Sequence, residues 1–412
     1  MYTLAIYLYL IAVCIAALFN KRARMLVKGH WNAYKKLRRE ADKSEPYIWV
    51  HAASLGEFEQ GCPLMERIKR EHPECKILLT FFSPSGYEVR KNREGADIVC
   101  YLPLDTPANV QAFFHYVRPR MLILIKYEFW QNYLRGCKRL GIPVYSVSSI
   151  FRPRQVFFRW YGRLSGYNRV LRKVTHFFVQ NEQSRQLLAT LGHTANVTVV
   201  GDTRFDRVID IRNAAKPLPL VETFAADRKV MVCGSSWPGD EALFIPWFKR
   251  QQGMKLIIAP HVIDESHLHD IEASLDGCRT LRYSDATPDN VAAADVLIIN
   301  CFGLLSSIYR YGQVAMVGGG FGHGLHNVPE AAVYGMPVII GPNNQNFREA
   351  RHLLDAGGCF EVRDQQDFDA TADRLFTDAE ALRTAGQIAG DYIRNNAGAT
   401  EVIYQHIFGN HL

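Results

Sequence analysis

The chain has 412 residues, which is too long for one ordinary domain core and predicts two domains. Hydrophobic residues make up 48% of it and charged residues 22%, which excludes an intrinsically disordered protein. The net charge of +7 fits a soluble protein with a basic surface, or one that works against an anionic lipid or nucleic acid. The nine cysteines form no CxxC pair and no zinc-like spacing, so we expect reduced thiols in a cytosolic compartment.

The N-terminal segment predicts a membrane anchor over residues 1–20. Residues 2–19 carry no charge and would span roughly 27 Å as a helix, close to the thickness of a bilayer's hydrocarbon core. Residues 21–39 then carry eight Lys or Arg and no acid, with Trp31 and Tyr34 among them. A helix buried in the core is the main alternative. A signal peptide is disfavoured because the basic residues follow the apolar run. The charge asymmetry places the bulk of the protein in the cytoplasm, with the basic segment at an anionic membrane surface.

Beyond Tyr47 the chain alternates short apolar runs with helix-like segments, which predicts α/β architecture. These runs are residues 48–50, 77–80, 121–125, 144–147 and 177–179, then 230–233, 256–258, 296–299, 314–317 and 338–340. Their length and lack of polar alternation predict strands buried on both faces of parallel sheets. The pattern lapses over 207–228, which indicates a linker. We expect Rossmann-like domains at 21–206 and 229–412, facing each other across a cleft, and the last helix can pack back on the first domain.

Two polar motifs follow predicted strands of the first half. The segment His51-Ala52-Ala53-Ser54-Leu55-Gly56-Glu57 has small residues that suit a tight strand-to-helix turn. Glu57 falls at the helix start, where it can act as a general base or simply favour the helix dipole. The segment Lys126-Tyr127-Glu128-Phe129-Trp130-Gln131-Asn132 follows another strand. It fits either a site with a Lys–Glu pair or an ordinary helix start with core aromatics.

Three motifs follow strands of the second half. The small residues of Gly234-Ser235-Ser236-Trp237 would let backbone N–H groups approach a phosphate, although a turn without a ligand is equally consistent. Residues 317–330 hold five glycines in seven residues before a helix expected at 330–334, which makes a phosphate-cradle candidate. A polar loop at 341–347 ends the last strong strand. The glycine-rich loop is neither a Walker loop nor a dinucleotide fingerprint, since no Gly-Lys-Ser/Thr follows and it comes late in its domain.

The side chains near these motifs indicate anion and sugar binding, not metal binding. Glu330 can bind ribose hydroxyls, because a carboxylate accepts two hydrogen bonds from a vicinal diol. His261 and His267 follow a strand and are expected as anion contacts. No HExxH or Ser-His-Asp set is present, so we expect no metal and no cofactor. The basic residues gather beside the anchor and no recognition motif appears, so we expect no nucleic acid as partner.

Taken together, these motifs resemble the Kdo transferase family, which moves 3-deoxy-D-manno-octulosonic acid (Kdo) from CMP-Kdo to the lipid A precursor. The resemblance runs from the anchor to about Asn346. Residues 51–57 resemble the family's catalytic segment, and residues 127–132 resemble its acidic E-x-E-x-W-P-N segment. Residues 201–206 resemble its closing strand G-N-x-K-F-D. His326-Asn327 with Glu330 resembles its donor loop G-G-H-N-x-x-E, and residues 341–347 its G-P-H-x-x-N-F loop.

The chain also departs from the family pattern. Lys126 replaces the first acid of the E-x-E pair, and Gln131 replaces the usual Pro. Leu325 stands where the second Gly of G-G-H-N is expected, and His261 follows Pro260 where the family tends to have Arg-His. The role of the first acid is therefore open in this chain.

The resemblance implies a GT-B fold and an inverting, metal-independent transfer at the cytoplasmic face of the bacterial inner membrane. It implies CMP-Kdo as donor, a lipid A precursor as acceptor and the membrane surface as partner; the oligomeric state stays open. The expected catalytic residues are Glu57 and Glu128. The expected substrate-binding residues are Ser54, Gly56, Ser235, Ser236, His261, Gly318, Gly319, Gly320, His326, Asn327, Glu330 and Asn346. Two alternatives remain: a GT-B transferase or epimerase that uses a UDP-sugar, and a membrane-bound nucleotide-sugar-binding protein without catalysis.

Overall fold

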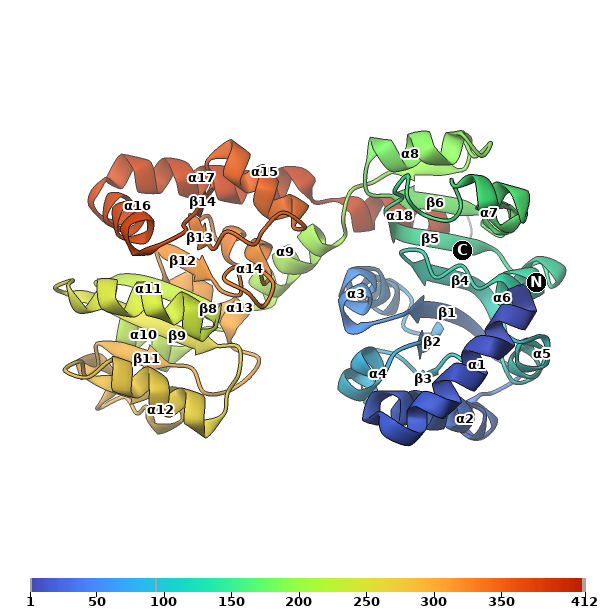
Figure 1. Cartoon of the computed structure of the whole chain (residues 1–412), viewed down its shortest axis with the longest axis horizontal. Helices are drawn as coiled ribbons and strands as arrows, with labels where there is room; N and C mark the ends of the chain where they lie inside the picture. Colours follow the sequence, from blue (N-terminus) through green and yellow to red (C-terminus); the bar gives the residue numbers. More distant parts are fainter. Residues whose placement is uncertain (1, 93–94, 410–412) are drawn as a thin grey trace. The chain divides into compact units, whose positions relative to one another are not determined.

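The computed structural model describes residues 2–92 and 95–409, and the chain forms two compact units (Figure 1). Within the described residues, unit 1 holds 2–207 with 397–409, and unit 2 holds 208–396. Each unit is built on a seven-stranded sheet whose paired strands all run parallel. The predicted α/β class with two parallel sheets is confirmed.

The sheet of unit 1 has the strand order β3-β2-β1-β4-β5-β6-β7. Its strands are β1 (Pro46–Ala52), β2 (Lys76–Phe81), β3 (Ile98–Tyr101), β4 (Arg118–Ile125), β5 (Val144–Ser149), β6 (His176–Val179) and β7 (Val197–Val199). Its helices are α1 (Tyr2–Phe19), α2 (Lys21–Glu40), α3 (Leu55–Glu71), α4 (Pro84–Arg90), α5 (Pro107–Tyr116), α6 (Gln131–Arg139), α7 (Trp160–Leu164), η1 (Tyr167–Lys173), α8 (Glu182–Ala189) and α18 (Ala399–Phe408). The helix α9 (Arg204–Ala214) crosses the boundary into unit 2.

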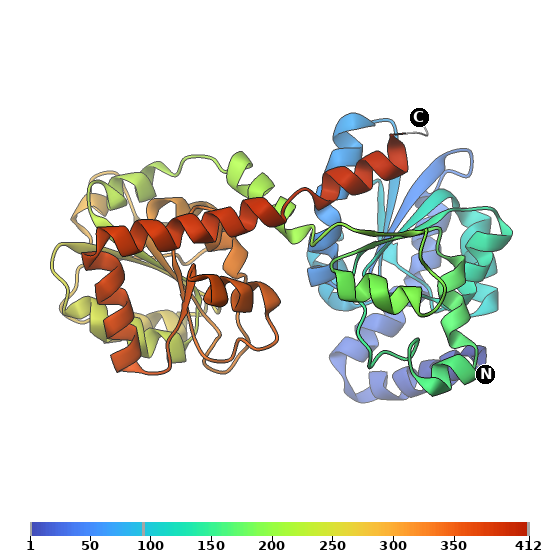
Figure 2. The same ribbon diagram turned by 90° about the horizontal axis from the view of Figure 1, so that it is seen from above.

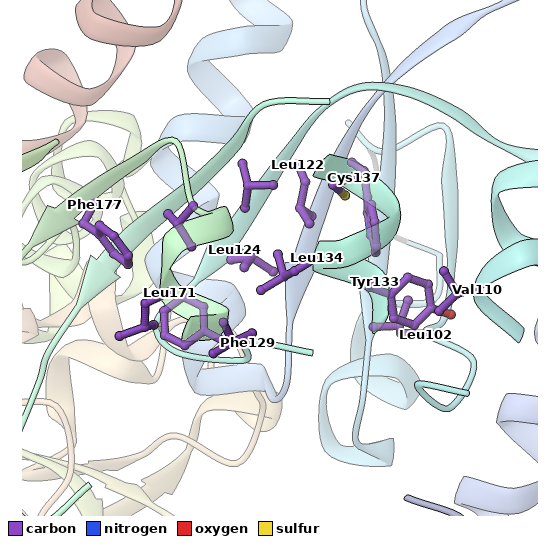
Figure 3. Packing of buried hydrophobic residues seen from close by; sticks show 14 of the residues in the cluster. Leu102, Val110, Leu122, Leu124, Phe129, Tyr133, Leu134, Cys137, Leu171 and Phe177 are labelled. Atoms are coloured by element: carbon purple, nitrogen blue, oxygen red, sulfur yellow. The ribbon is translucent and has the colours of Figure 1, made fainter. Parts of the chain in front are cut away.

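Successive residues of the central strands of unit 1 point to opposite faces of the sheet, and each face carries its own core. On β4, Leu122 and Leu124 belong to one core, and Ile123 and Ile125 to the other. Figure 3 shows Leu122 and Leu124 beside Leu134 of α6 in the first core. The second core includes Ile403, Tyr404, Ile407 and Phe408 of α18, which packs beside α3. Both faces are therefore covered, as an apolar parallel sheet requires.

The helix α18 is also held by a polar contact with the start of α9. The carboxylate of Asp206 accepts hydrogen bonds from the N–H groups of Gly398 and Thr400, at 2.5 and 2.7 Å. These are N–H groups at the beginning of α18, which have no partner inside that helix. Figure 2 shows the preceding helix α17 (Ala379–Asn396) leading into α18.

The sheet of unit 2 has the order β10-β11-β9-β8-β12-β13-β14. Its strands are β8 (Lys229–Ser236), β9 (Met254–Pro260), β10 (Thr280–Arg282), β11 (Val296–Ile298), β12 (Val314–Val317), β13 (Val338–Ile340) and β14 (Cys359–Glu361). The other elements before α17 are α10 (Pro219–Ala225), α11 (Pro238–Lys249), α12 (Glu265–Ser274), η2 (Tyr283–Asp285), η3 (Val291–Ala293), α13 (Leu305–Ile308), η4 (Tyr309–Tyr311), α14 (Val328–Ala332), α15 (Arg348–Ala356) and α16 (Gln365–Thr377). The segment 207–228 is therefore largely helical, with residues 215–218 between α9 and α10.

Two local predictions are wrong. Residues 201–206 do not form a strand: β7 ends at Val199, and α9 begins at Arg204. Gly201 takes φ +89°, and the side chain of Asp202 accepts the N–H of Arg204 at 3.0 Å, so the chain turns there and starts a helix. The helix expected at 330–334 begins two residues earlier, at Val328. Pro329 lies in its first turn, where the fixed φ of proline favours a helix start.

The N-terminal segment forms a helix throughout, and α1 is long and apolar enough to cross a membrane by length and composition. Ile6 is its one buried residue, while Leu4, Ile11 and Phe19 are exposed. This exposure is not that of a helix enclosed in a soluble core. The beginning of α1 contacts the rest of unit 1, since the hydroxyl of Tyr2 donates to Asp105 Oδ2 at 2.7 Å.

Candidate active site

Three charged side chains of unit 1 lie at the carboxyl ends of two neighbouring strands. Glu57 follows β1, and Lys126 and Glu128 follow β4. The two strands pair directly, with His51 opposite Leu124. Ligands of open parallel sheets bind outside these strand ends, so the sequence motifs of unit 1 converge at a suitable place.

Glu57 lies in the first turn of α3 and is 8% exposed. Its Oε2 accepts the N–H of Ala53 at 2.7 Å, whereas the side chain of Ser54 makes no capping bond. Burial raises the pKa of the Glu57 carboxyl, while the Ala53 N–H and the charge of Lys126 act in the opposite direction. Glu57 thus bonds to the backbone at the helix start and has a raised pKa, and both interpretations of this residue stay predictions.

Glu128 is half-buried and lies close enough to Glu57 for the two charges to repel. Burial, followed by this repulsion, raises the pKa of Glu128 to about 7. Two carboxyl groups in such a pair lose their protons in separate steps. Burial raises the pKa of both carboxyl groups, so the pair binds protons more tightly than exposed glutamates do.

Lys126 has a left-handed backbone conformation with φ +63°, which costs a side chain other than glycine roughly 1–2 kcal/mol. Its carbonyl oxygen accepts the hydroxyls of Ser146 and Ser149, at 2.9 and 2.7 Å. Burial lowers the pKa of the Lys126 ammonium, and the negative charge of Glu57 opposes that shift. Strain of this kind, held by surrounding bonds, is frequent at functional sites.

The aromatics of the same motif serve packing. Phe129 is buried and its ring lies 6.1 Å from both Phe151 and Phe177. The ring of Trp130 lies 4.9 Å from Phe82. The expectation of core aromatics at a helix start is therefore fulfilled at this position, beside the charged residues.

Gly56 is exposed, and a Cβ placed on it would meet no atom of the described residues within 4 Å. Neither packing nor a left-handed φ in unit 1 requires glycine there. Ser54, two residues earlier, is half-buried.

The sequence analysis did not propose Asp202 and Arg204 as site residues, although both act electrostatically on Lys126. Arg204 Nε donates to Asp202 Oδ2 at 3.0 Å, and Gln60 Nε2 donates to Asp202 Oδ1 at the same distance. The signal that could have indicated this pair is an acid and a base two residues apart, shortly after a strand.

In unit 2, the carboxyl end of β8 is strained and closely packed. Ser235 takes φ +53°, and the pairing with β9 shifts register between Gly234 and Ser236. The Ser236 hydroxyl donates to Glu241 Oε1 at 2.8 Å, and Glu241 also contacts His267. His267 is thus engaged inside the unit, and Ser236 acts as part of that network.

The glycine-rich loop is shaped by backbone packing. A Cβ on Gly318 would lie 2.3 Å from the Ser235 carbonyl oxygen, and one on Gly320 would lie 2.6 Å from the Gly341 nitrogen. The N–H of Gly318 donates to Gly234 O, and the N–H of Gly319 donates to Asp240 Oδ2, both at 2.9 Å. These two N–H groups are already used inside the unit, so a phosphate at this loop has to be held by other groups.

Four rings gather beside this loop, and we call them the histidine–tryptophan cluster (Trp237, His261, His323 and His326). Trp237 stacks on His323 with ring centroids 3.8 Å apart and 7° between planes, and the rings of His261 and His326 lie 4.3 Å apart. Trp237 Nε1 donates to His326 Nε2 at 3.1 Å, so that nitrogen is unprotonated. Burial and then the nearby His261 lower the pKa of His326 to about 4.

The remaining predicted residues of unit 2 are Asn327 and Glu330, at the start of α14, and Asn346, in the loop before α15. Asn327 Nδ2 donates to Glu330 Oε1 at 2.7 Å, which brings these two together at the start of α14. Asn346 is exposed in its loop. The fully buried amide of that loop belongs to Asn344, which donates to Gly341 O and to Glu361 Oε2. The sequence analysis missed Asn344, His323 and Trp237.

Comparisons with known proteins point to the same family as the sequence motifs. Residues 28–207 match the domain family described as 3-deoxy-D-manno-octulosonic-acid transferase (kdotransferase). A curated 3-deoxy-D-manno-octulosonic acid transferase of Aquifex aeolicus is 28% identical over 326 residues, which cover 77% of this chain and 82% of the relative. The enzyme of the same name from Haemophilus influenzae is 24% identical over 86% of this chain and 84% of its own.

Solved structures show the same fold at low sequence identity. A UDP-GlcNAc 2-epimerase from Neisseria meningitidis matches 88% of this chain and 100% of its own, with a TM-score of 0.61 and 14% identity. The MurG structure of Acinetobacter baumannii matches 88% of this chain and 99% of its own, with a TM-score of 0.54 and 11% identity. The predicted GT-B fold is thereby confirmed. The chain is thus similar to 3-deoxy-D-manno-octulosonic acid transferases over most of its length, and its residues 28–207 match their domain family, in agreement with the resemblance of its motifs.

Proposed function

We propose that this protein transfers Kdo from CMP-Kdo to a hydroxyl group of the lipid A precursor, with inversion at the anomeric carbon. The observation that carries the proposal is the pair of Glu57 and Glu128 at the strand ends of unit 1, within the segment that matches the Kdo transferase family. Environments that separate the proton affinities of two carboxyl groups are typical of acid–base catalysis.

In the proposed step, Glu57 removes the proton from the acceptor hydroxyl. The oxygen then forms a bond to the anomeric carbon of Kdo, and the bond from that carbon to the phosphate oxygen of CMP breaks. The electron pair leaves with CMP. Glu57 is assigned as base because Lys126 and the Ala53 N–H favour its charged form, whereas its charge keeps Glu128 partly protonated.

Unit 2 is proposed to hold the donor. The half-buried Ser235 and the histidine–tryptophan cluster lie beside the turn after β8 and the glycine-rich loop, where they can contact the phosphate. Glu330 can accept hydrogen bonds from the ribose hydroxyls. Because the N–H groups of Gly318 and Gly319 are engaged, we assign the phosphate contact to His261 and His326 rather than to those glycines.

The N-terminal helices fit a lipid acceptor. We propose that α1 anchors the chain in the cytoplasmic face of the bacterial inner membrane, and that the basic side chains of α2 face lipid head groups. The anchor would keep the enzyme and its lipid acceptor on the same surface, which raises the effective concentration of the acceptor.

The test is transfer of labelled Kdo from CMP-Kdo to a lipid A precursor by the purified full chain. We expect labelled lipid product, and we expect CMP, but not UDP, to raise the melting temperature. Transfer from UDP-sugars with protection by UDP would contradict the proposed donor. Protection by CMP without transfer to any lipid acceptor would leave a nucleotide-sugar-binding protein and would contradict catalysis.

A further inference from the structure

The backbone of Lys126 is held by hydrogen bonds to the neighbouring strand β5. The N–H of Lys126 donates to Val147 O at 2.8 Å, and its carbonyl oxygen is held by Ser146 and Ser149. These three bonds fix a left-handed backbone that a lysine does not favour on its own. The fold therefore keeps this residue in an unfavourable backbone conformation.

The acids around Lys126 are already engaged. Glu57 accepts the Ala53 N–H, and Asp202 accepts Gln60 and Arg204. Among residues 2–92 and 95–409, no carboxylate lies within the 4.0 Å of an ion pair with the Lys126 ammonium. The ammonium is nevertheless half-buried, and burial disfavours its charged form. A cation in this position is stabilised by a ligand that brings a negative charge.

Two other cations near Lys126 also favour an anionic ligand at this position. Arg204 and Arg152 lie close enough to Lys126 to repel its charge. Arg204 is neutralised by Asp202, but Arg152 is exposed. Gly56, which precedes Glu57, is exposed, and a Cβ placed on it would meet no other side chain of unit 1 within 4 Å.

We infer that Lys126 is a specificity-determining residue that binds an anionic group, a phosphate or a carboxylate, beside the hydroxyl that Glu57 deprotonates. The inference rests on the proposed function. Two sources of the anion have the same chemistry: a phosphate of the lipid acceptor and the carboxylate of the transferred sugar. Lysine suits either as a compact point charge.

The experiment compares Lys126→Gln and Lys126→Arg with the control Lys138→Gln, an exposed lysine on α6. KM is measured separately for donor and acceptor, with phosphorylated and dephosphorylated lipid acceptors. A hydrogen bond to a charged group corresponds to roughly a ten- to hundredfold change in KM, which Lys126→Gln should cause and Lys126→Arg should largely restore. Lys138→Gln should behave as the wild type.

The two sources give different patterns. If the anion is an acceptor phosphate, the acceptor KM rises in Lys126→Gln and the difference from the wild type vanishes with dephosphorylated acceptor. If it is the sugar carboxylate, the donor KM rises with both acceptors. Unchanged KM values for both substrates, with only a shift of the pH profile, would overturn the inference and leave Lys126 as a residue that tunes Glu57.

A second measurement does not depend on transfer. Inorganic phosphate should raise the melting temperature of the wild type and of Lys138→Gln, and this protection should be reduced in Lys126→Gln. If the wild type transfers no Kdo but this difference is present, the proposed function fails and the anion site stands. If protection is equal in all three proteins, the anion site is overturned whether or not Kdo is transferred.

Discussion

Burial and then the negative charge of Glu57 raise the pKa of Glu128 to about 7. The two residues lie 71 positions apart in the sequence and meet because β1 and β4 are neighbours in the sheet. Glu57 has the better-stabilised carboxylate, since the Ala53 N–H and Lys126 favour its charged form. The two carboxyl groups therefore have different electrostatic environments.

Replacing Glu57 with Gln should lower the pKa of Glu128, because the repelling charge disappears while the amide oxygen can still accept the Ala53 N–H. Carbon-detected NMR of labelled glutamate side chains measures this directly. The matched control is Glu182→Gln on α8, which should leave the titration of Glu128 unchanged. An unaltered Glu128 titration in Glu57→Gln would show that the two carboxyls are not coupled.

Replacing Gly320 with Ala should destabilise unit 2. The added methyl would lie 2.6 Å from the Gly341 backbone nitrogen, and backbone atoms cannot move aside as a flexible side chain can. We expect a loss of roughly 1–3 kcal/mol in the free energy of unfolding, measured by urea denaturation. Gly56→Ala provides the contrast, because its methyl meets nothing in unit 1 and stability should be unchanged. Equal stabilities of the two variants would contradict this account of the glycine-rich loop.

His326 should make the protein less stable in mild acid. Its pKa is lowered to about 4 in the folded state, whereas the unfolded chain has the ordinary value of 6.5. As pH falls from 6.5 towards 4, the unfolded state takes up a proton that the folded state does not, so stability is lost in that window. His326→Asn should therefore gain stability relative to the wild type as the pH is lowered. If the difference in unfolding free energy between His326→Asn and the wild type were the same at every pH between 7 and 4, the lowered pKa of His326 would be contradicted.

Removing residues 2–20 should release the protein from membranes. The deleted helix α1 is the one candidate span among the described residues, and α2 retains only its charges and one buried face. We expect the full chain to resist extraction of membranes with carbonate and the shortened chain to be extracted. Resistance of the shortened chain would place the membrane attachment elsewhere.

The strands that build both units could be predicted because buried parallel strands are short, apolar and without polar alternation, as at 121–125 and 314–317. The short strands β7, β10 and β14 lie at sheet edges and have weaker patterns, so they were not predicted from the sequence. The strand at 201–206 was expected from the resemblance to the family's closing strand, and it is wrong because the chain turns at Gly201 and Asp202 accepts the N–H of Arg204.

The site could be predicted only where its residues follow a strand directly. Glu57 and Glu128 are of this kind, because the carboxyl ends of parallel strands share one edge, whereas Ser235 is still part of β8. The stacking of His323 on Trp237 joins two loops that are far apart in the sequence, so no local pattern reports it. The internal bonds of Gly318 and Gly319 likewise depend on β8 and α11, which only the folded unit brings to the loop.

The most direct test of the central claim is single-turnover transfer of Kdo from CMP-Kdo to the lipid A precursor by the wild type and by Glu57→Gln. If Glu57 is the base, the wild type forms product and Glu57→Gln is slower by roughly 10²–10⁴-fold, while Glu182→Gln matches the wild type. Transfer at the wild-type rate by Glu57→Gln would contradict the assignment of the base.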